Sequence, residues 1–365
     1  METFVHYFYM IVFPYLLLFG TFGNVVSTGL MRRYSQDIWS TCGYLAILLP
    51  LDLIKLYVEC GDDWVKQFVD MQLSKRILHL SNAVCKVYTF VYTLILQETK
   101  WIMVAIAIET MITIKKPKRI YEMCTRERAN AIMLFISVIL ITLDLHFFWT
   151  HGLVRPGDDP HISIYMCTYV SELSDKFRDY IWPIINFLIE HVSPWCIILV
   201  CMLYSIIGLV KRDRKADEEY LKKYFLDTKT LHQLNKSVFI ICLIAGGAYT
   251  LDIISISIHW MASHNFISIE YEHSFLMRSF LAVLSNVFIS HKFWVFYICC
   301  DKFRQDVKCL WHCMCRPLRR QRRHNRKCIT SADTNKACSS WQDTDTCLSE
   351  ELHERFASGN IKLSL

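Results

Sequence analysis

The sequence predicts an all-α membrane protein: a seven-transmembrane-helix bundle with a short amphipathic helix after span seven. Three observations support this fold class. The 365 residues are 53% hydrophobic and only 20% charged, whereas an average soluble domain has about 25% charged residues. Seven stretches are apolar over the length of about 20 residues that crosses a bilayer. Basic residues gather in every second connection between these stretches.

The seven predicted spans are joined by connections of different lengths, of which the second outer one is long. The third, fifth and seventh contain internal polar residues, so hydropathy places their ends only to within several positions. No internal repeat of the kind that marks many transporters is visible. The first apolar run is long enough to span, and no basic segment precedes it as in a signal peptide. The predicted spans are residues 7–31, 41–58, 80–114, 129–149, 180–210, 237–260 and 275–300.

The placement of the basic residues predicts the orientation of the bundle. The connections after spans one, three and five and residues 302–327 after span seven hold 26 Lys and Arg, whereas the opposite connections hold six. Cytoplasmic loops carry such an excess of Lys and Arg. We therefore expect a multi-pass plasma-membrane protein with its N-terminus outside and its C-terminus in the cytoplasm.

Short motifs in the first three spans occur in a distinctive order. Span one carries Gly23-Asn24-Val25-Val26, and span two carries Asp52 after a Leu-Leu-Pro-Leu run. Span three begins near Cys85, and Glu109 follows 24 residues later within residues 99–111, Thr-Lys-Trp-Ile-Met-Val-Ala-Ile-Ala-Ile-Glu-Thr-Met. These motifs and their spacing resemble those of rhodopsin-like (class A) G-protein-coupled receptors.

The later spans extend this resemblance, which covers about residues 15 to 310. Pro194 is similar to the fifth-helix proline, and Phe239 with Cys242 is similar to the start of the sixth-helix motif. Residues 292–304 resemble the corresponding segment of invertebrate neuropeptide-type orphan receptors. The resemblance implies a receptor for an extracellular, neuropeptide-like ligand, with a heterotrimeric G protein as its partner. No motif indicates an enzyme or a metal site, and we expect no cofactor.

In this family a disulfide joins the third helix to the second outer loop. The resemblance implies that Cys85 and Cys167 form it. Both cysteines lie on the expected oxidising side of the membrane. Two free thiols are the alternative.

Several residues that the family uses for activation are replaced in this sequence. Thr110 stands where the family has the Arg after Glu109, and Leu243 and Ala245 replace the sixth-helix Trp and Pro. These replacements make ordinary G-protein coupling doubtful. They favour an alternative function, that of a non-signalling pseudoreceptor that scavenges a ligand or partners another receptor. A seven-span transporter is a third, less favoured interpretation.

Two lysines inside the spans require partners, because charges within a bundle usually pair. In the family the second-helix Asp binds sodium with help from a seventh-helix Asn, and Lys292 takes the position of that Asn. It can pair with Asp52 or extend to the headgroups. Lys100 has Glu98 and Glu190 as candidate partners. The candidate activation and ion-site residues are Asp52, Lys292, Lys100, Glu109, Thr110, Phe239 and Pro194.

The expected outer connections carry more acidic than basic residues. This excess favours a cationic ligand, such as a basic peptide, although an ordinary solvated loop has the same composition. Aminergic receptors have an Asp where this chain has Tyr92, which argues against a biogenic amine. Polar groups inside spans usually face the bundle. The candidate ligand-binding residues are Tyr88, Tyr92, Gln97, Glu190, His191, Asp252 and His259.

The C-terminal segment predicts attachment to the inner leaflet. Residues 301–315 have the pattern of a juxtamembrane amphipathic helix. Cys309, Cys313 and Cys315 are candidates for palmitoylation, and free thiols are the alternative. The basic run in the cytoplasmic tail, residues 316–365, favours anionic lipid rather than nucleic acid as its partner. An arrestin and a PDZ-domain protein are candidate partners of this polar, disordered tail. The predicted domains are therefore residues 1–300, 301–315 and 316–365.

Overall fold

The structure is a computed structural model that describes residues 2–37, 39–66, 68, 73–154, 166–170, 177, 181–211, 228–263 and 271–322. The chain divides into two units, Met1–Cys300 and Asp301–Leu365. Each unit is described by itself.

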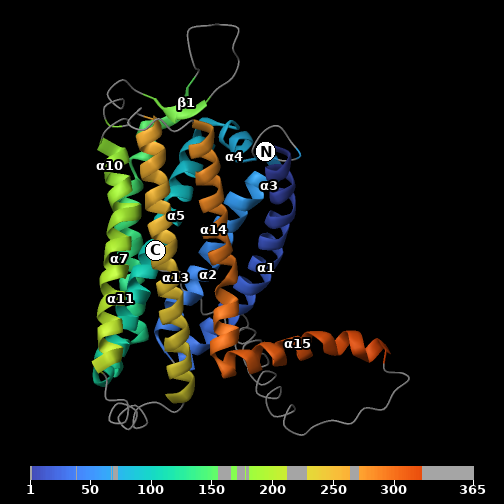
Figure 1. The fold of residues 1–365 in the computed structure, drawn as a ribbon, viewed down its shortest axis with the longest axis vertical. Helices are drawn as coiled ribbons and strands as arrows, with labels where there is room; N and C mark the ends of the chain where they lie inside the picture. Colours follow the sequence, from blue (N-terminus) through green and yellow to red (C-terminus); the bar gives the residue numbers. More distant parts are fainter. Residues whose placement is uncertain are drawn as a thin grey trace, which may run out of the picture. The chain divides into compact units, whose positions relative to one another are not determined.

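The first unit is a bundle of seven helical segments that run alongside one another (Figure 1). Six of them are long and apolar enough to cross a membrane by length and composition, and α14 qualifies when it is counted with the helix that follows it. The segments are α1 (Glu2–Asp37), α2 (Thr41–Leu56) with η1 (Tyr57–Gly61), α5 (Asn82–Lys115), α7 (Arg126–Asp144) with α8 (Phe147–Thr150), α10 (Trp182–Phe187) with η4 (Leu188–Val192) and α11 (Ser193–Lys211), α13 (Thr228–Ser263) and α14 (Tyr271–Cys299).

Most of these helices are longer than the predicted spans. Helix α13, for example, begins at Thr228, nine residues before the predicted start at 237. Hydropathy detects only the apolar part of a helix, whereas backbone hydrogen bonding continues into polar residues. Side-chain caps mark two of the starts: Val84 N donates to Ser81 Oγ at α5 (3.2 Å), and Arg128 N donates to Thr125 Oγ1 at α7 (3.4 Å).

Two of the spans contain a π-helical turn. In span five η4 ends at Val192, two residues before Pro194, whose ring has no N–H to donate and excludes a regular bond to the preceding turn. Ser193 Oγ donates to Leu188 O at 2.8 Å, and the backbone N–H of Ser193 donates to the same carbonyl. The turns in spans two and five carry Glu59 and Glu190, so each brings a carboxylate into the bundle.

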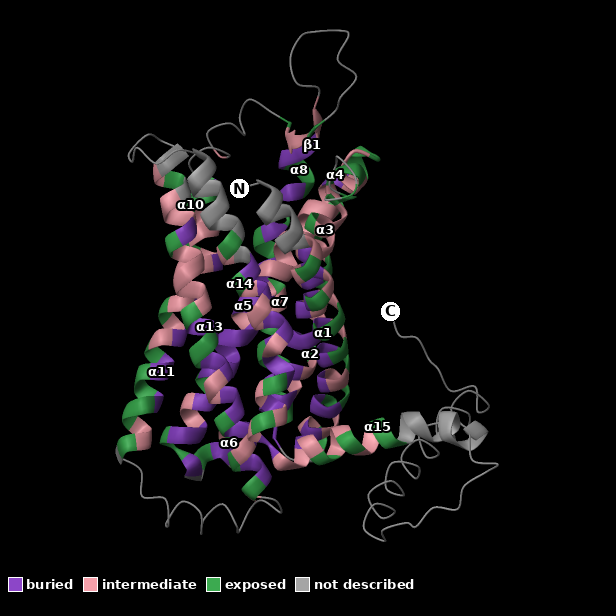
Figure 2. Cartoon of the chain, turned by 45° about the vertical axis from the view of Figure 1, so that its right-hand side comes forward, coloured by how far each residue is buried: buried purple, intermediate pink, exposed green. Residues whose placement is uncertain are grey.

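Helix α5 is the central helix of the bundle. It packs against α2, α7, α11 and α13. All six residues from Ile102 to Ala107 are buried, whereas a helix at the surface buries only one face. Buried residues therefore lie along the inside of the bundle, and exposed ones lie on its outer faces (Figure 2).

Short elements close the two ends of the bundle. One end, which we call the hairpin end, carries α3 (Asp62–Lys66), α4 (Leu73–Leu78) and the antiparallel strands β1 (His151–Val154) and β2 (Met166–Tyr169). The other end, which we call the α6 end, carries η2 (Pro117–Arg119) and α6 (Ile120–Met123).

The described part of the second unit is one helix, α15 (Asp301–Arg322). It ends seven residues beyond the predicted boundary at 315. The added residues include Leu and several Arg, which are good helix formers, and the helix continues through Pro317 into the basic run. The tail from residue 323 onwards lies outside the described residues.

Candidate functional site

The interior of the bundle carries an unusual number of charged and amide side chains. The largest group, which we call the mid-bundle cluster, joins α5, α7, α10 and η4. Its members are Gln97, Lys100, Asp144, Asn186, Glu190 and His191.

A buried ion pair forms the centre of the mid-bundle cluster. Lys100 Nζ lies 2.9 Å from Glu190 Oε1, and the two side chains are 6% and 9% exposed. Asn186 Nδ2 donates to the second carboxylate oxygen, Oε2, at 3.1 Å. Both oxygens of Glu190 therefore have a donor, which offsets the cost of burying the charge.

His191 closes a ring with this ion pair. Its Nδ1 lies 3.1 Å from Lys100 Nζ, and its Nε2 lies 3.3 Å from Glu190 Oε1. An ammonium group only donates, so Nδ1 accepts and the neutral imidazole carries its proton on Nε2. The Nε2 atom that carries this proton lies within 3.3 Å of the Glu190 carboxylate.

Gln97 extends the cluster towards α7. Its Nε2 lies 3.2 Å from Asn186 Oδ1 and 3.3 Å from Asp144 Oδ1. Three of the predicted ligand-binding residues, Gln97, Glu190 and His191, thus meet around Lys100. Sequence reasoning missed Asn186 and Asp144, although a polar residue inside an apolar span is itself a signal.

The structure separates the two candidate partners of Lys100. Glu98 accepts from Ser137 Oγ on α7 at 2.5 Å, while Glu190 takes the lysine. Residues two positions apart do not share a helix face, so Glu98 and Lys100 point to different neighbours.

A second buried ion pair joins α2 to α14. Lys292 Nζ lies 2.5 Å from Asp52 Oδ2, and the two side chains are 4% and 3% exposed. The same amine lies 5.1 Å from the centre of the Phe288 ring. Lys292 therefore points into the bundle and does not extend to the headgroups.

A third lysine in the spans, Lys55, was not among the residues predicted from the sequence. Lys55 Nζ lies 3.8 Å from Glu59 Oε1, one turn further along the same helical segment. The spacing of four residues within an apolar run was the available signal. Asp252 on α13 is half-buried and has no ion pair among the described residues, and the side chain of His259 lies outside them.

At the α6 end, Glu109 contacts hydroxyl groups and no cation among the described side chains. Thr41 Oγ1 donates to Glu109 Oε2, and Ser40 Oγ lies 3.4 Å from the same oxygen and 2.6 Å from Cys124 O. Burial raises the pKa of the Cys124 thiol to about 12, so it stays neutral beside the carboxylate. The start of α2 is thereby tied to α5 and to the end of α6.

Thr110 is completely buried and donates to Ile106 O of its own helix at 2.7 Å. The position that follows Glu109 therefore presents no charge at the α6 end of the bundle.

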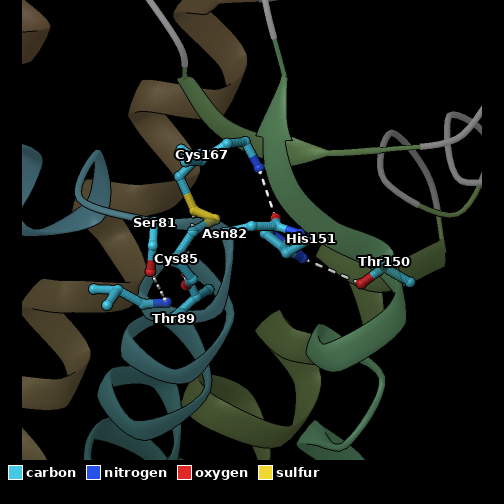
Figure 3. The surroundings of a disulfide bond; sticks show 9 residues. Ser81, Asn82, Cys85, Thr89, Thr150, His151 and Cys167 are labelled. Atoms are coloured by element: carbon cyan, nitrogen blue, oxygen red, sulfur yellow. Dashed lines mark hydrogen bonds between the residues drawn. A yellow bond between two sulfur atoms is a disulfide. The ribbon is translucent and has the colours of Figure 1, made fainter.

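The hairpin end is held to α5 by a disulfide between Cys85 and Cys167, whose Cα atoms are 5.7 Å apart (Figure 3). Leu153 lies opposite Cys167 in the strand pair, and its N–H donates to Asn82 Oδ1 at 3.0 Å. Strand β1 is thus joined to the first turn of α5 by a covalent bond through β2 and by a direct hydrogen bond.

His151 is the first residue of β1 and is buried in this hairpin. Its ring lies 4.2 Å from that of Tyr169, and its Nδ1 lies 3.1 Å from Thr150 Oγ1. Burial, with a smaller contribution from His146, lowers the pKa of His151 to about 4. The imidazole is therefore neutral at physiological pH and packs as an aromatic ring.

A model of the rhodopsin family of seven-transmembrane receptors matches residues 67–289. The chain belongs to this family. No curated protein matches it at a significant level. The matched segment contains Cys85, Glu109, Glu190 and Asp252, but it ends three residues before Lys292.

Membership of the family identifies the protein as a multi-pass plasma-membrane receptor. Rhodopsin-family receptors are not enzymes, and they bind extracellular ligands and couple to G proteins in general. The ion pairs Lys100–Glu190 and Lys292–Asp52 therefore lie within a receptor bundle.

The predicted ligand-binding residues of the receptor do not form one site. Tyr88 and Tyr92 line an apolar groove of about 460 Å³ between α2 and α5, apart from the mid-bundle cluster. Residues at helical positions 88 and 92 share a face that differs from the face of Gln97.

The other candidate residues lie at separate places in the receptor. Pro194 is buried at the start of α11, and Phe239 is half-buried in α13. Cys309 is half-buried in α15 and is not part of a disulfide. The side chains of Cys313 and Cys315 lie outside the described residues.

Thr41→Val should destabilise the receptor by about 1–3 kcal/mol, because a buried carboxylate loses a donor while the side chain keeps its shape. Thermal unfolding of the purified receptor measures the change. Thr142→Val is the matched control, since the Thr142 hydroxyl is exposed and donates only to its own helix. Equal shifts in the two variants would contradict a role for the Thr41–Glu109 contact.

Proposed function

We propose that the protein receives an extracellular, neuropeptide-like ligand at its hairpin end and responds by opening its α6 end to the cytoplasm. The orientation rests on the exposed basic residues of the α6 end, which include Lys116, Arg119, Arg126 and Arg128, and on the positive-inside rule. A disulfide at the hairpin end is consistent with an oxidising exterior.

The observation that carries this proposal is the buried ion pair between Asp52 and Lys292. It joins α2 to α14 in the interior of the bundle, where separated charges are costly. Any opening that moves α14 away from α2 must break the pair or carry it along. The pair therefore stabilises the closed arrangement, and a ligand activates by binding the open arrangement more tightly.

The mid-bundle cluster and Asp252 support a ligand with a cationic group. Lys100 is already paired with Glu190, whereas Asp252 has no ion pair among the described residues. A buried or half-buried carboxylate favours a positive partner. Of the acidic residues expected outside, Asp62 and Asp63 lie at the hairpin end, and the side chains of Asp70, Asp158, Asp159, Glu172, Asp175, Glu270 and Glu272 lie outside the described residues.

The altered activation position supports a second candidate function, that of a pseudoreceptor. Thr110 is bonded to its own helix and offers no charge to a G protein. In this function the protein binds and internalises its ligand without a second-messenger response.

One comparison separates the two functions. Wild type and Thr110→Arg are expressed at matched surface levels, and cAMP and inositol phosphate are measured with and without a library of basic peptides. We expect the wild type to respond to a peptide, and we expect Thr110→Arg to raise the maximal response severalfold at an unchanged half-maximal concentration. The Arg would restore a charge at the α6 end, about 20 Å or more from the ligand by helix geometry.

A wild type that is silent towards every peptide would overturn signalling. If it still takes up a labelled peptide, and only Thr110→Arg signals, the pseudoreceptor function replaces the first proposal. Thr113→Arg is the matched control, because Thr113 is also buried at this end of α5 and its hydroxyl also donates to a carbonyl of its own helix, Glu109 O.

A further inference from the structure

The groove between α2 and α5 opens on the outer face of the bundle. Its lining is almost wholly aliphatic and aromatic, and its volume of about 460 Å³ lies within the range of small-molecule sites. Ile54, Val87 and Val91 line it and are 46%, 48% and 43% exposed. In a membrane receptor these side chains face the hydrocarbon layer, so the groove admits an apolar chain directly from the bilayer.

The groove runs towards a basic end. It reaches Ala83 and Val84 in the first turn of α5. Helix α4, which packs against α5 at the hairpin end (Figure 1), presents exposed Lys75 and Arg76. Neither of these two residues has an ion pair among the described residues.

The start of α4 is held by Asp62, which forms no ion pair with Lys75 or Arg76 among the described residues. Asp62 Oδ1 accepts from Ser74 N at 2.9 Å, and Asp62 Oδ2 accepts from Ser74 Oγ at 2.5 Å. Asp62 therefore caps the start of α4 and ties it to α3. Lys75 and Arg76 are left to attract an anion at the membrane surface.

We propose that this groove binds an amphiphile with one hydrocarbon chain and an anionic head, such as a carboxylate or a phosphate. The chain lies against Ile54, Val87 and Val91, and the head lies at Lys75 and Arg76. The proposal excludes a sterol, which has no anionic head for the basic end, and a two-chain phospholipid.

The site also touches the charged interior. Lys55 lines the groove and is paired with Glu59 inside span two. An occupied groove therefore fixes the helix segment that carries this ion pair.

The test uses the full-length receptor in phosphatidylcholine nanodiscs. The probe is a lysophosphatidic acid whose acyl chain carries a photoreactive diazirine, and mass spectrometry maps the crosslinks. We expect crosslinks within residues 54–58 and 83–96, and competition by unlabelled lysophosphatidic acid or palmitate. Competition by only one of these two identifies the head as phosphate or carboxylate.

Variants locate the chain and the head separately. Val91→Trp and, as a second filling variant, Val87→Phe should lower labelling about tenfold, whereas Val138→Trp, at an exposed position on α7, should leave it unchanged. The double variant Lys75→Gln with Arg76→Gln should weaken binding of the probe about tenfold, and it should leave binding of lysophosphatidylcholine unchanged. Thermal unfolding confirms that each variant is folded.

Two results would overturn the proposal. The first is labelling that both groove-filling variants leave unchanged, or that spreads evenly over the outer face. The second is equal competition by cholesterol, lysophosphatidylcholine or a two-chain phosphatidylserine, since none of these combines a single chain with an anionic head.

Discussion

Lys292→Met is expected to destabilise the receptor by about 3–5 kcal/mol, because it leaves Asp52 as a buried carboxylate without its partner. The amine lies 2.5 Å from Asp52, and both side chains are nearly fully buried. Methionine keeps most of the side-chain volume, so the lost free energy of unfolding measures the removal of the charge rather than a change in packing. Thermal unfolding of the purified receptor in detergent measures it.

Two further variants separate the ion pair from general packing. Adding Asp52→Asn to Lys292→Met removes both charges and should recover most of the lost stability. Lys116→Met, at an exposed position, should change stability by less than about 0.5 kcal/mol. A Lys292→Met shift no larger than that of Lys116→Met would show that the pair does not hold α14 to α2.

The same ion pair predicts that the wild type and a Lys292 variant differ in how sodium affects their unfolding temperature. The wild type should unfold at the same temperature in sodium chloride and choline chloride, because Lys292 supplies the positive charge at Asp52. Lys292→Asn should become more stable in sodium chloride than in choline chloride. Identical responses of the wild type and this variant would contradict the replacement of a cation by the lysine.

Lys100→Met should have a similarly large effect, about 3–5 kcal/mol, because Glu190 is 9% exposed and loses its cation. Glu190→Gln alone should also destabilise the receptor, because it leaves the buried Lys100 without its anion, although Asn186 can still bond the amide. The double variant should be more stable than the sum of the single variants implies. Thermal unfolding of the three variants gives the coupling energy, which for residues in contact is typically about 0.5–3 kcal/mol.

Lys86→Met is the control on the same helix, since Lys86 has no ion pair among the described residues. Additivity of Lys100→Met and Glu190→Gln to within about 0.3–0.5 kcal/mol would rule out the ion pair as a stabilising contact. If the cluster also binds the ligand, Glu190→Gln should shift the half-maximal peptide concentration at matched surface expression. An unchanged concentration would place the ligand elsewhere.

The seven spans were predictable from the sequence, because an apolar run of sufficient length has few alternatives in a membrane. The Cys85–Cys167 disulfide followed from the resemblance to rhodopsin-like receptors, and the structure contains it. The helix ends were less predictable, as α13 and α15 show, because helical hydrogen bonding does not stop where hydropathy falls.

The contacts in the interior of the bundle could not be predicted from the sequence alone. The sequence left two candidate partners for Lys100, and it left Lys292 either paired with Asp52 or extended to the headgroups. The structure pairs Lys100 with Glu190 and Lys292 with Asp52. Residue 190 reaches Lys100 through a π-helical turn, which alters the helix register by an amount that no residue pattern specifies.

By itself, the sequence determined that this chain crosses the membrane seven times and resembles a receptor whose activation residues are replaced. Only the tertiary structure decided which buried charges meet, that Glu109 contacts Thr41 and Ser40, and that Tyr88 and Tyr92 line an outer groove rather than the interior cluster. The physical reason is the distance along the chain over which each feature is determined. Hydropathy and charge bias add up along the chain, whereas an ion pair between residues 52 and 292 depends on the rotation and packing of two helices 240 residues apart.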